Sequence, residues 1–151
     1  FAEENGMEPI RISQINYSLA HSSVETFGDN TLVCMDTKEF RWYKKHDFPV
    51  MAFSPQAKGF FAKLAKGDAA NNLPEGQYAG PANLARLAKV KQLSEQTGDT
   101  PAKITLGYLN SQPFFVSSVF AVTKLWQLDE DMEAQDLTYD PKTVAFLENM
   151  I

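Results

Sequence analysis

The sequence has almost no cysteine and no long apolar run. Cys34 is the only cysteine among 151 residues, so no disulfide can form within the chain. No stretch of about 18 consecutive apolar residues occurs, and we therefore expect no membrane-spanning helix. The opening residues FAEENGMEPI have neither a basic stretch nor an apolar core, and we expect that they are not a signal peptide. A single thiol is also typical of a reducing compartment, and these features together predict a cytoplasmic location.

The chain has no excess of positive charge and no spacing typical of metal ligands. Its 14 Lys and Arg residues against 19 Asp and Glu give a net charge of −5, which argues against nucleic-acid binding. The two histidines, His21 and His46, have no Cys, His or carboxylate partner at a metal-site spacing, and we predict no metal. A hydrophobic content of 44% is enough for a core, so residues 1–151 form one domain or part of one.

Apolar runs and helix-capping residues alternate along the chain. The runs at 10–19, 49–54 and 114–122 have the character of β-strands. Helical spacing with capping residues predicts helices at 36–47, 81–96, 101–111, 124–135 and 141–151, after a helix end that Gly6 closes. The segment 57–80 is rich in Gly, Asn and Lys, has no strong period and is predicted to be a long loop. This order predicts an α/β fold with parallel strands that are buried on both faces.

Two helix predictions can be stated residue by residue. Gly98 suits a left-handed helix end, and Thr100 followed by Pro101 matches an N-cap with proline at the first helical position. In the helix 124–135 the apolar residues recur at helical spacing. We therefore expect three of its side chains to face inward, namely Leu125, Leu128 and Met132.

Four sequence blocks resemble the aldo-keto reductase family in their order and spacing. They are ENGMEPIRISQINYSL, PVMAFSPQAKGFF, LAKVKQLSEQTGDTPAKITLGYLNSQP and VSSVFAVTKLWQLDEDMEAQDLTYD. The resemblance implies the C-terminal arc of a (β/α)8 TIM barrel, with about three βα units that carry strands six to eight. It further implies that this chain is a fragment whose N-terminal portion is missing. Three strands cannot close a barrel, so we expect open sheet edges and self-association through them.

The same resemblance assigns six residues to a nicotinamide cofactor, NADP or NAD. Gln14 matches the position near the nicotinamide carboxamide, and Phe53 replaces the Tyr that stacks on the nicotinamide ring. The remaining matches are to the pyrophosphate loop and to the phosphate and adenine segment: Ser54, Gln56, Thr123 and Lys124. Lys124 is the one cation of its segment and is followed by Asp129, Glu130 and Asp131, which leaves the choice between NADP and NAD open.

Plainer interpretations of these residues remain open. Gln14 and Asn16 alternate on one strand face, where they also suit a hydrogen-bonded or solvated pair. Phe53 follows a buried run and suits a core aromatic. Three lysines of the predicted loop either fold over a pyrophosphate or form a solvated face: Lys58, Lys63 and Lys66.

The resemblance also implies what the chain lacks. The catalytic Asp, Tyr, Lys and His of the family come from its second to fourth strands, and no part of this chain aligns there. We therefore predict no catalytic residue and no activity for the chain alone. In the full-length protein the implied reaction interconverts a small carbonyl substrate and its alcohol. The alternative is a non-catalytic nucleotide-binding or assembly module derived from such a barrel; an Asp, Tyr, Lys and His at strand ends upstream of Phe1 would favour the enzyme.

Overall fold

A sheet of three parallel strands runs through the protein. The computed structural model describes residues 1–67 and 77–148. The strands are β1 (Ser13–Asn16), β2 (Val50–Phe53) and β3 (Val116–Val119), in the order β1-β2-β3. Phe53, the last residue of β2, lies opposite Asn16 on one side and Val119 on the other, so all three strands end at the same edge. The predicted α/β fold with parallel strands is confirmed, although each strand is shorter than its apolar run.

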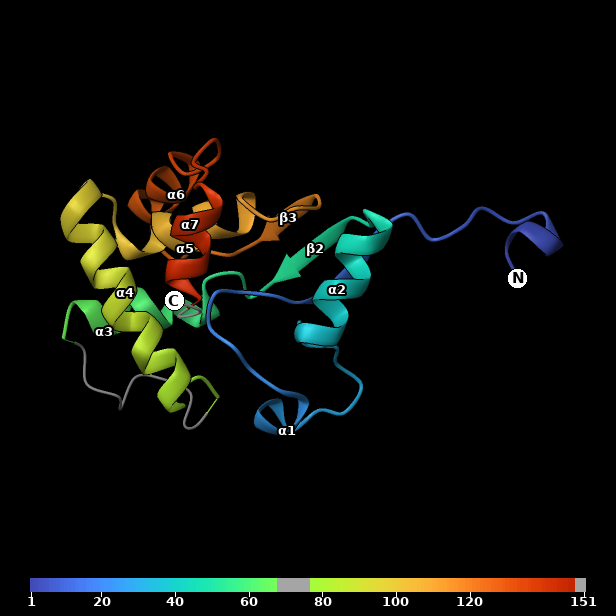
Figure 1. Ribbon diagram of the computed structural model, residues 1–151, viewed down its shortest axis with the longest axis horizontal. Coiled ribbons are helices and arrows are strands. Elements are labelled where there is room, and N and C mark those ends of the chain that lie inside the picture. The colour runs from blue at the N-terminus through green and yellow to red at the C-terminus, as the bar shows by residue number, and fades with distance from the viewer. Residues whose placement is uncertain (68–76, 149–151) are drawn as a thin grey trace.

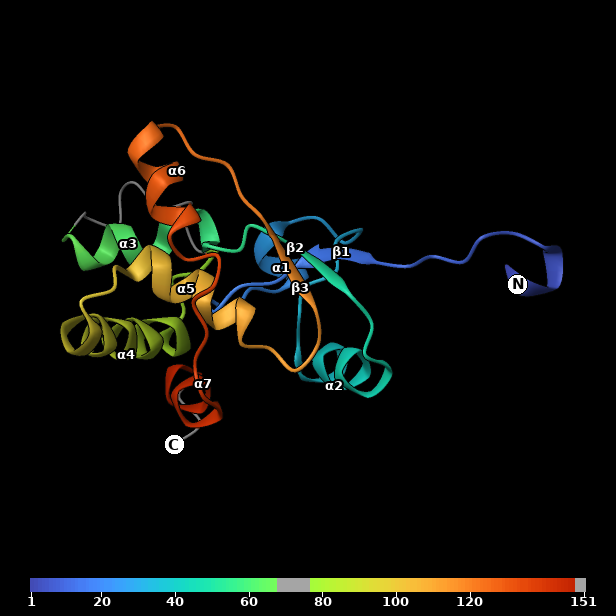
Figure 2. The same ribbon diagram turned by 90° about the horizontal axis from the view of Figure 1, so that it is seen from above.

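Helices fill both crossovers and follow the last strand. The first crossover contains α1 (Val24–Phe27) and α2 (Thr37–His46). The second contains η2 (Ala57–Gly59), α3 (Phe60–Ala65), α4 (Pro81–Thr97) and α5 (Pro101–Asn110), and β3 is followed by α6 (Leu125–Met132) and α7 (Pro141–Leu147). Figures 1 and 2 show α3 to α7 gathered at one end of the sheet, with α2 at the other. None of the helices in the described ranges is long and apolar enough to cross a membrane.

The helix ends lie where the capping residues predict them. The Asp36 carboxylate accepts from the backbone N–H of Glu39 at 2.8 Å, and the Thr100 hydroxyl accepts from that of Lys103 at 3.3 Å. Gly98 ends α4 with φ of 80°, in the left-handed region that favours glycine. These predictions are confirmed because they depend on contacts within four residues.

The prediction of a loop over 57–80 is wrong for its first part. Residues 57–65 form η2 and α3, and residues 68–76 lie outside the described part of the chain. Phe60 and Phe61 are both buried, with ring centroids 5.1 Å apart. A helix of six residues is too short to show a hydrophobic period, so burial of this aromatic pair stabilises it without a sequence signal.

Two predictions of burial are also wrong. The side chains of Leu125, Leu128 and Met132 are exposed on α6, Leu125 by 82%, while Asp131 is buried. α6 packs on α5, and Asp131 faces the Gln56 side chain, whereas the apolar stripe of α6 is left exposed by the described part of the chain. The sheet is likewise not buried on both faces, because Val119 of β3 is exposed.

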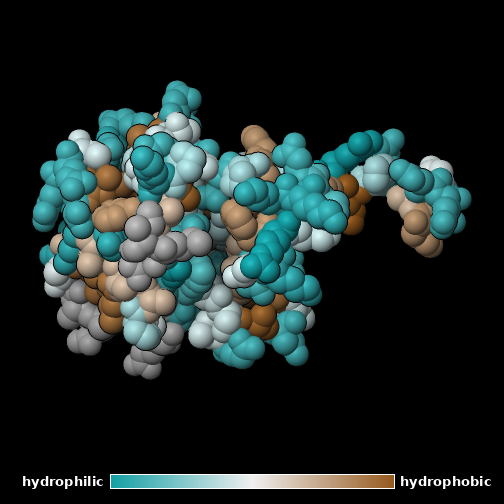
Figure 3. All heavy atoms as spheres, viewed as in Figure 1, coloured by the Kyte–Doolittle hydropathy of each residue, from teal (hydrophilic) through white to brown (hydrophobic). Residues whose placement is uncertain are grey.

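The N-terminal residues 1–12 form an arm that projects away from the body. The arm begins with η1 (Glu3–Asn5), closed by Gly6 with φ of 62°, which confirms the predicted helix end. It carries exposed apolar side chains, among them Phe1, Met7 and Ile10. The space-filling view shows these hydrophobic residues among hydrophilic ones on the projecting segment (Figure 3). The arm therefore adds exposed apolar surface to that of α6.

Helix α5 is largely buried and packs against four other elements. All six residues from Ile104 to Leu109 are buried, and the helix packs against α3, α4, α6 and β3. Gly107 lies where the segment 137–139 crosses the helix, and a Cβ there would be 2.8 Å from the Tyr139 ring and 2.9 Å from Leu137. Glycine lowers helix stability by about 1 kcal/mol relative to alanine, so this crossing explains its presence.

We expect Gly107→Ala to destabilise the fold by about 1–3 kcal/mol, because the added methyl overpacks the crossing. Gly80→Ala is the matched control: φ is not positive there and nothing lies within 4 Å of the added Cβ. It should cost less than about 1 kcal/mol, the effect of a poorer N-cap. Urea unfolding of both variants measures the difference, and equal losses would contradict the close approach at Gly107.

Candidate functional site

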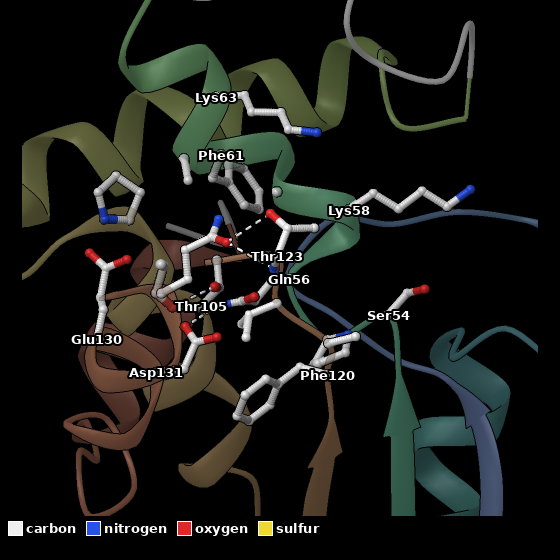
Figure 4. Close-up of a pocket in the computed structure, with 18 of the residues that line it drawn as sticks. Ser54, Gln56, Lys58, Phe61, Lys63, Thr105, Phe120, Thr123, Glu130 and Asp131 are labelled. Carbon is white, nitrogen blue, oxygen red and sulfur yellow. Dashed lines mark hydrogen bonds between the residues drawn. The ribbon is translucent and has the colours of Figure 1, made fainter. Parts of the chain in front are cut away.

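A cavity of about 690 Å³ lies beyond the C-terminal ends of β2 and β3 (Figure 4). Its wall comes from the segments that follow these strands, from α3, from the first turn of α5 and from α6. Ligand pockets in proteins commonly have volumes of roughly 300–1,000 Å³. Parallel sheets bind their ligands at the carboxyl ends of the strands, because the loops that follow the strands converge there. The cavity therefore has the place and size of a ligand site.

The chain leaves β2 through a strained turn. Ser54, Ala57 and Lys58 have φ of 52°, 49° and 56°, and Gly59 follows with 79°. For a residue other than glycine the left-handed region costs roughly 1–2 kcal/mol. Backbone hydrogen bonds hold the turn, from the N–H of Ala57 to Ser54 O and from the N–H of Gly59 to Gln56 O, both at 2.9 Å. Such strain concentrates at binding sites, and here it directs residues 54–59 along the cavity wall.

A hydrogen bond joins this turn to α6. The Gln56 amide nitrogen, Nε2, donates to the Asp131 carboxylate oxygen Oδ1 at 2.6 Å, and Asp131 is only 4% exposed. Burial raises the pKa of the Asp131 carboxyl, and the hydrogen bond from Gln56 lowers it in part. Residues 75 positions apart thus fix the distance between the two sides of the cavity.

The start of α6 is capped from within the helix. The Gln127 side-chain oxygen Oε1 accepts from the backbone N–H groups of Thr123 at 3.1 Å and Lys124 at 3.0 Å, and from the Thr123 hydroxyl at 3.2 Å. Free N–H groups at a helix start commonly bind phosphates. Here the backbone N–H groups of Thr123 and Lys124, which precede the helix, already donate to Gln127. Fewer free backbone donors therefore remain to bind an anion.

Opposite charges lie on opposite sides of the cavity. Figure 4 shows Lys58 and Lys63 extending from η2 and α3, and Glu130 and Asp131 on α6 across from them. The Lys58 ammonium donates to the Gln77 side-chain oxygen at 2.8 Å, whereas no ion pair among the described residues includes Lys63. The α3 side therefore suits anionic groups of a ligand, and the α6 side suits hydrogen-bond donors.

The first turn of α5 contributes wall residues that the sequence analysis did not identify, Pro101, Ala102 and Thr105. Pro101 and Thr105 are four positions apart and therefore share one helix face. The Thr105 hydroxyl donates to Ala102 O at 2.8 Å, so this polar group is satisfied within the helix. The helix itself was predicted, but only the packed structure shows that its N-terminal end points at the cavity.

Three of the six predicted cofactor residues line the cavity together: Ser54, Gln56 and Thr123. The other three do not. Gln14 is exposed on β1, and the Lys124 side chain is exposed beside the cavity. Phe53 packs edge-on against Phe27, with ring centroids 6.4 Å apart and planes at 76°.

Asn16, which alternates with Gln14 on β1, has a buried structural role. Its amide nitrogen donates to Phe53 O at 3.3 Å, and its oxygen accepts from the Ser22 hydroxyl at 2.7 Å. The hydrogen-bonded interpretation of this strand pair therefore applies to Asn16 and not to the exposed Gln14. Within residues 1–67 and 77–148, no three His, Cys, Asp or Glu side chains are grouped so as to hold a metal ion.

The comparisons with known proteins agree with this arrangement. The model of the Aldo/keto reductase family matches residues 3–151, and the chain belongs to this family. The chain is similar to the crystal structure of a thermostable aldo-keto reductase, Tm1743, in complex with the inhibitor epalrestat, with a TM-score of 0.61 and 14% identity over 95% of the chain and 41% of that structure. It is also similar to an aldo/keto reductase from Klebsiella pneumoniae in complex with NADP and acetate, with a TM-score of 0.58 and 19% identity over 92% of the chain and 38% of that structure.

These two likenesses concern the fold, since both identities are low. The chain spans about two-fifths of the length of the two solved structures. The recognition of the family from the four sequence blocks is confirmed by the family match.

We expect Asp131→Asn to raise the free energy of unfolding at about pH 7. Burial raises the pKa of this carboxyl, so its ionisation destabilises the fold once the pH exceeds the folded pKa. Below the unfolded pKa of about 3.9 both side chains are neutral, and the gain should vanish near pH 3. Asp136→Asn, at an exposed site, is the control and should change little. Urea unfolding at both pH values measures the effect; a gain that does not depend on pH would contradict this account.

Proposed function

We propose that the chain is the C-terminal, cofactor-binding part of an NAD(P)(H)-dependent aldo-keto reductase, in which it carries strands six to eight of the barrel. The observation that carries the proposal is the cavity at the C-terminal ends of β2 and β3. It brings Ser54, Gln56 and Thr123, which the sequence assigns to the cofactor, together with lysines of η2 and α3. Family membership and an NADP-containing structure among the similar folds support it.

The residues around the cavity fit a dinucleotide. Its pyrophosphate is anionic, which suits the lysines on the α3 side, and its ribose hydroxyls suit the amide and hydroxyl groups of Gln56 and Thr123. The amino group of its adenine is a donor, which suits the Glu130 carboxylate on the α6 side. When bound, the cofactor supplies or accepts the hydride that interconverts a carbonyl and an alcohol.

The family resemblance assigns two of the remaining predicted residues, Gln14 and Phe53, to the nicotinamide end, and Lys124 to the phosphate and adenine segment. Phe53 ends β2 directly before Ser54, which lines the cavity, and Gln14 lies on the neighbouring strand β1, two residues before its end. We assign the ring of Phe53 to stacking and the amide of Gln14 to hydrogen bonding. Lys124 contributes its side chain, since its backbone N–H already bonds Gln127.

The proposal includes inactivity of the 151-residue chain alone. Carbonyl reduction needs a proton donor within hydrogen-bond reach of the substrate oxygen as well as a hydride source. By the family resemblance, that donor and its partners lie on strands that this chain does not contain. The residues described here therefore bind and orient the cofactor, and the missing portion supplies part of the pocket for the small carbonyl substrate.

We expect the purified chain to bind NADP or NAD in isothermal titration calorimetry without catalysing carbonyl-dependent oxidation of the reduced form. Ala121→Trp should weaken binding about tenfold or more by filling the cavity, which Ala121 lines from an exposed position. Ala88→Trp, on the exposed face of α4 and outside the cavity, is the matched control. If the folded chain binds neither NADP nor NAD, the proposal is wrong. If the chain alone oxidises the reduced cofactor in the presence of a carbonyl, the predicted inactivity is wrong.

We also propose that the isolated chain self-associates. The apolar stripe of α6, the exposed Phe115 and Val119 around β3, and the N-terminal arm place apolar surface in water. The outer edge of β1 is only partly covered, by backbone hydrogen bonds between Asn16 and the segment 33–35. Light scattering should give a mass above the 16.9 kDa of one chain, increasing with concentration. A constant monomer mass would contradict this expectation.

A further inference from the structure

His21 lies on the segment that follows β1, and its backbone is held by α4. Its N–H donates to the Asn83 side-chain oxygen Oδ1 at 2.8 Å, and its carbonyl accepts from the Asn83 amide nitrogen at 2.7 Å. The same nitrogen donates to Tyr78 O at 2.9 Å, and Asn83 is buried. One amide on α4 therefore joins the segment after β1 to the segment that precedes α4.

The His21 side chain contacts a second buried residue of α4. Its ring nitrogen Nε2 lies 3.3 Å from Nη2 of Arg86, which is only 7% exposed. An arginine side chain has N–H donors and no acceptor, so Nε2 accepts this hydrogen bond and carries no proton. A protonated imidazole has N–H groups at both ring nitrogens. The contact is therefore available only to the neutral form of His21.

Arg86 has no described carboxylate partner that would offset a second positive charge. Its guanidinium donates to Asn83 Oδ1 at 3.1 Å and to the Glu148 backbone carbonyl at 3.4 Å, and no ion pair in the described part of the chain includes it. The Glu148 carboxylate accepts instead from the Tyr108 hydroxyl at 2.7 Å. Loss of solvent on this side of the ring, and then the Arg86 charge, lower the pKa of His21. Protonation of His21 thus places two cations against each other.

Three tyrosines lie near this contact and stay neutral where a histidine titrates. Tyr78 precedes α4, Tyr108 lies on α5, and Tyr17 packs edge-on against Tyr108 with ring centroids 6.4 Å apart. Burial raises the pKa of all three hydroxyls. Between about pH 5 and 8 a change of charge at this contact therefore comes from the histidine and not from these tyrosines.

The segment held by this contact carries α1 and an aromatic side chain at the edge of the sheet. Figure 1 shows α1 on an excursion of the chain between β1 and α2. The ring of Phe27, the last residue of α1, packs edge-on against Phe53 and Tyr78, with both centroids at 6.4 Å. The Ser22 hydroxyl donates to Asn16 Oδ1 at 2.7 Å. None of these groups titrates near neutral pH, so the histidine is the pH-dependent attachment.

We propose that His21 is a pH-dependent switch that holds residues 20–28 on α4 while it is neutral and releases them when it is protonated. Arg86 is fixed in a buried helix face, whereas His21 lies on an exposed segment, so the segment is the part that moves. Release takes the Phe27 ring away from Phe53 and uncovers the C-terminal end of β2. The inference does not depend on the proposed function, because neither His21 nor Arg86 lines the cavity.

Hydrogen exchange measured by mass spectrometry tests the switch on the intact chain. The exchange rates are first corrected for the intrinsic effect of pH on amides. Protection of residues 20–28 should then fall by up to about tenfold between about pH 7.5 and pH 5.5, because pH 5.5 is about one unit below the ordinary pKa of histidine, about 6.5. Protection of α5 should stay constant, which excludes global unfolding as the cause.

Substitutions isolate the role of His21. His21→Gln retains an acceptor for Arg86 and cannot be protonated, so the protection of residues 20–28 should not depend on pH. His21→Lys is positively charged at both pH values and should lack this protection even at about pH 7.5. His46→Gln is the matched control, because His46 is the other histidine and lies on α2, where its ring bonds Trp42 O at 2.7 Å. This variant should keep the pH dependence of the wild type.

An NMR titration of the histidine ring protons gives an independent measurement, in which His46→Gln assigns the two signals. The His21 signal should have a midpoint below about 6.5. The switch is wrong if this midpoint is not lowered, if His21→Gln loses protection at low pH, or if His21→Lys stays protected. It is also wrong if His21 titrates while residues 20–28 remain protected, since the ring then only rotates into solvent. A lowered midpoint with a loss of protection that depends on His21 supports it.

Discussion

Burial of α5 is the constraint on which the rest of the structure depends. Six consecutive residues of this helix are buried, so it leaves no side open to solvent there and is stable only when other elements surround it. α3, α4, α6 and β3 supply that surrounding. Its polar groups fix the chain that follows: the Asn110 amide nitrogen donates to three carbonyls between residues 134 and 137, and the Tyr108 hydroxyl donates to Glu148 beyond α7 at 2.7 Å.

The cavity is a consequence of that packing. Because α5 is held centrally, its first turn forms one wall, and α3 and α6, which both pack on it, form two others. The Gln56–Asp131 hydrogen bond then fixes the separation between the β2 turn and α6. The charge distribution follows from the same arrangement, since the lysines of η2 and α3 and the carboxylates of α6 are kept apart across the space. A ligand with an anionic group at one end and hydrogen-bond donors at the other would bind with its anionic end toward the lysines and its donors toward α6.

The sequence predicts the features that depend on neighbouring residues. Caps such as Asp36 and Thr100 and the left-handed Gly98 depend on local spacing, and all are present. The apolar stripe of α6 was assigned to the core because periodicity shows that a face is apolar and does not show what covers it. The cap that Gln127 forms is local, three to four residues long, but the sequence analysis did not identify it, whereas the strained backbone at Ser54 has no local sequence pattern that predicts it.

The predicted cofactor residues divide in a way that the structure explains. Ser54, Gln56 and Thr123 follow β2 and β3, whose adjacent C-terminal ends converge on the cavity, and they meet there. Gln14 and Phe53 lie within β1 and β2 themselves. Side chains alternate there between the two faces of the sheet, and the side chain of Gln14 is exposed to solvent. In the proposed function a dinucleotide would extend from the cavity to these strand positions. The well-formed cavity is the end that α3, α5 and α6 build, and neither Gln14 nor Phe53 is part of its lining.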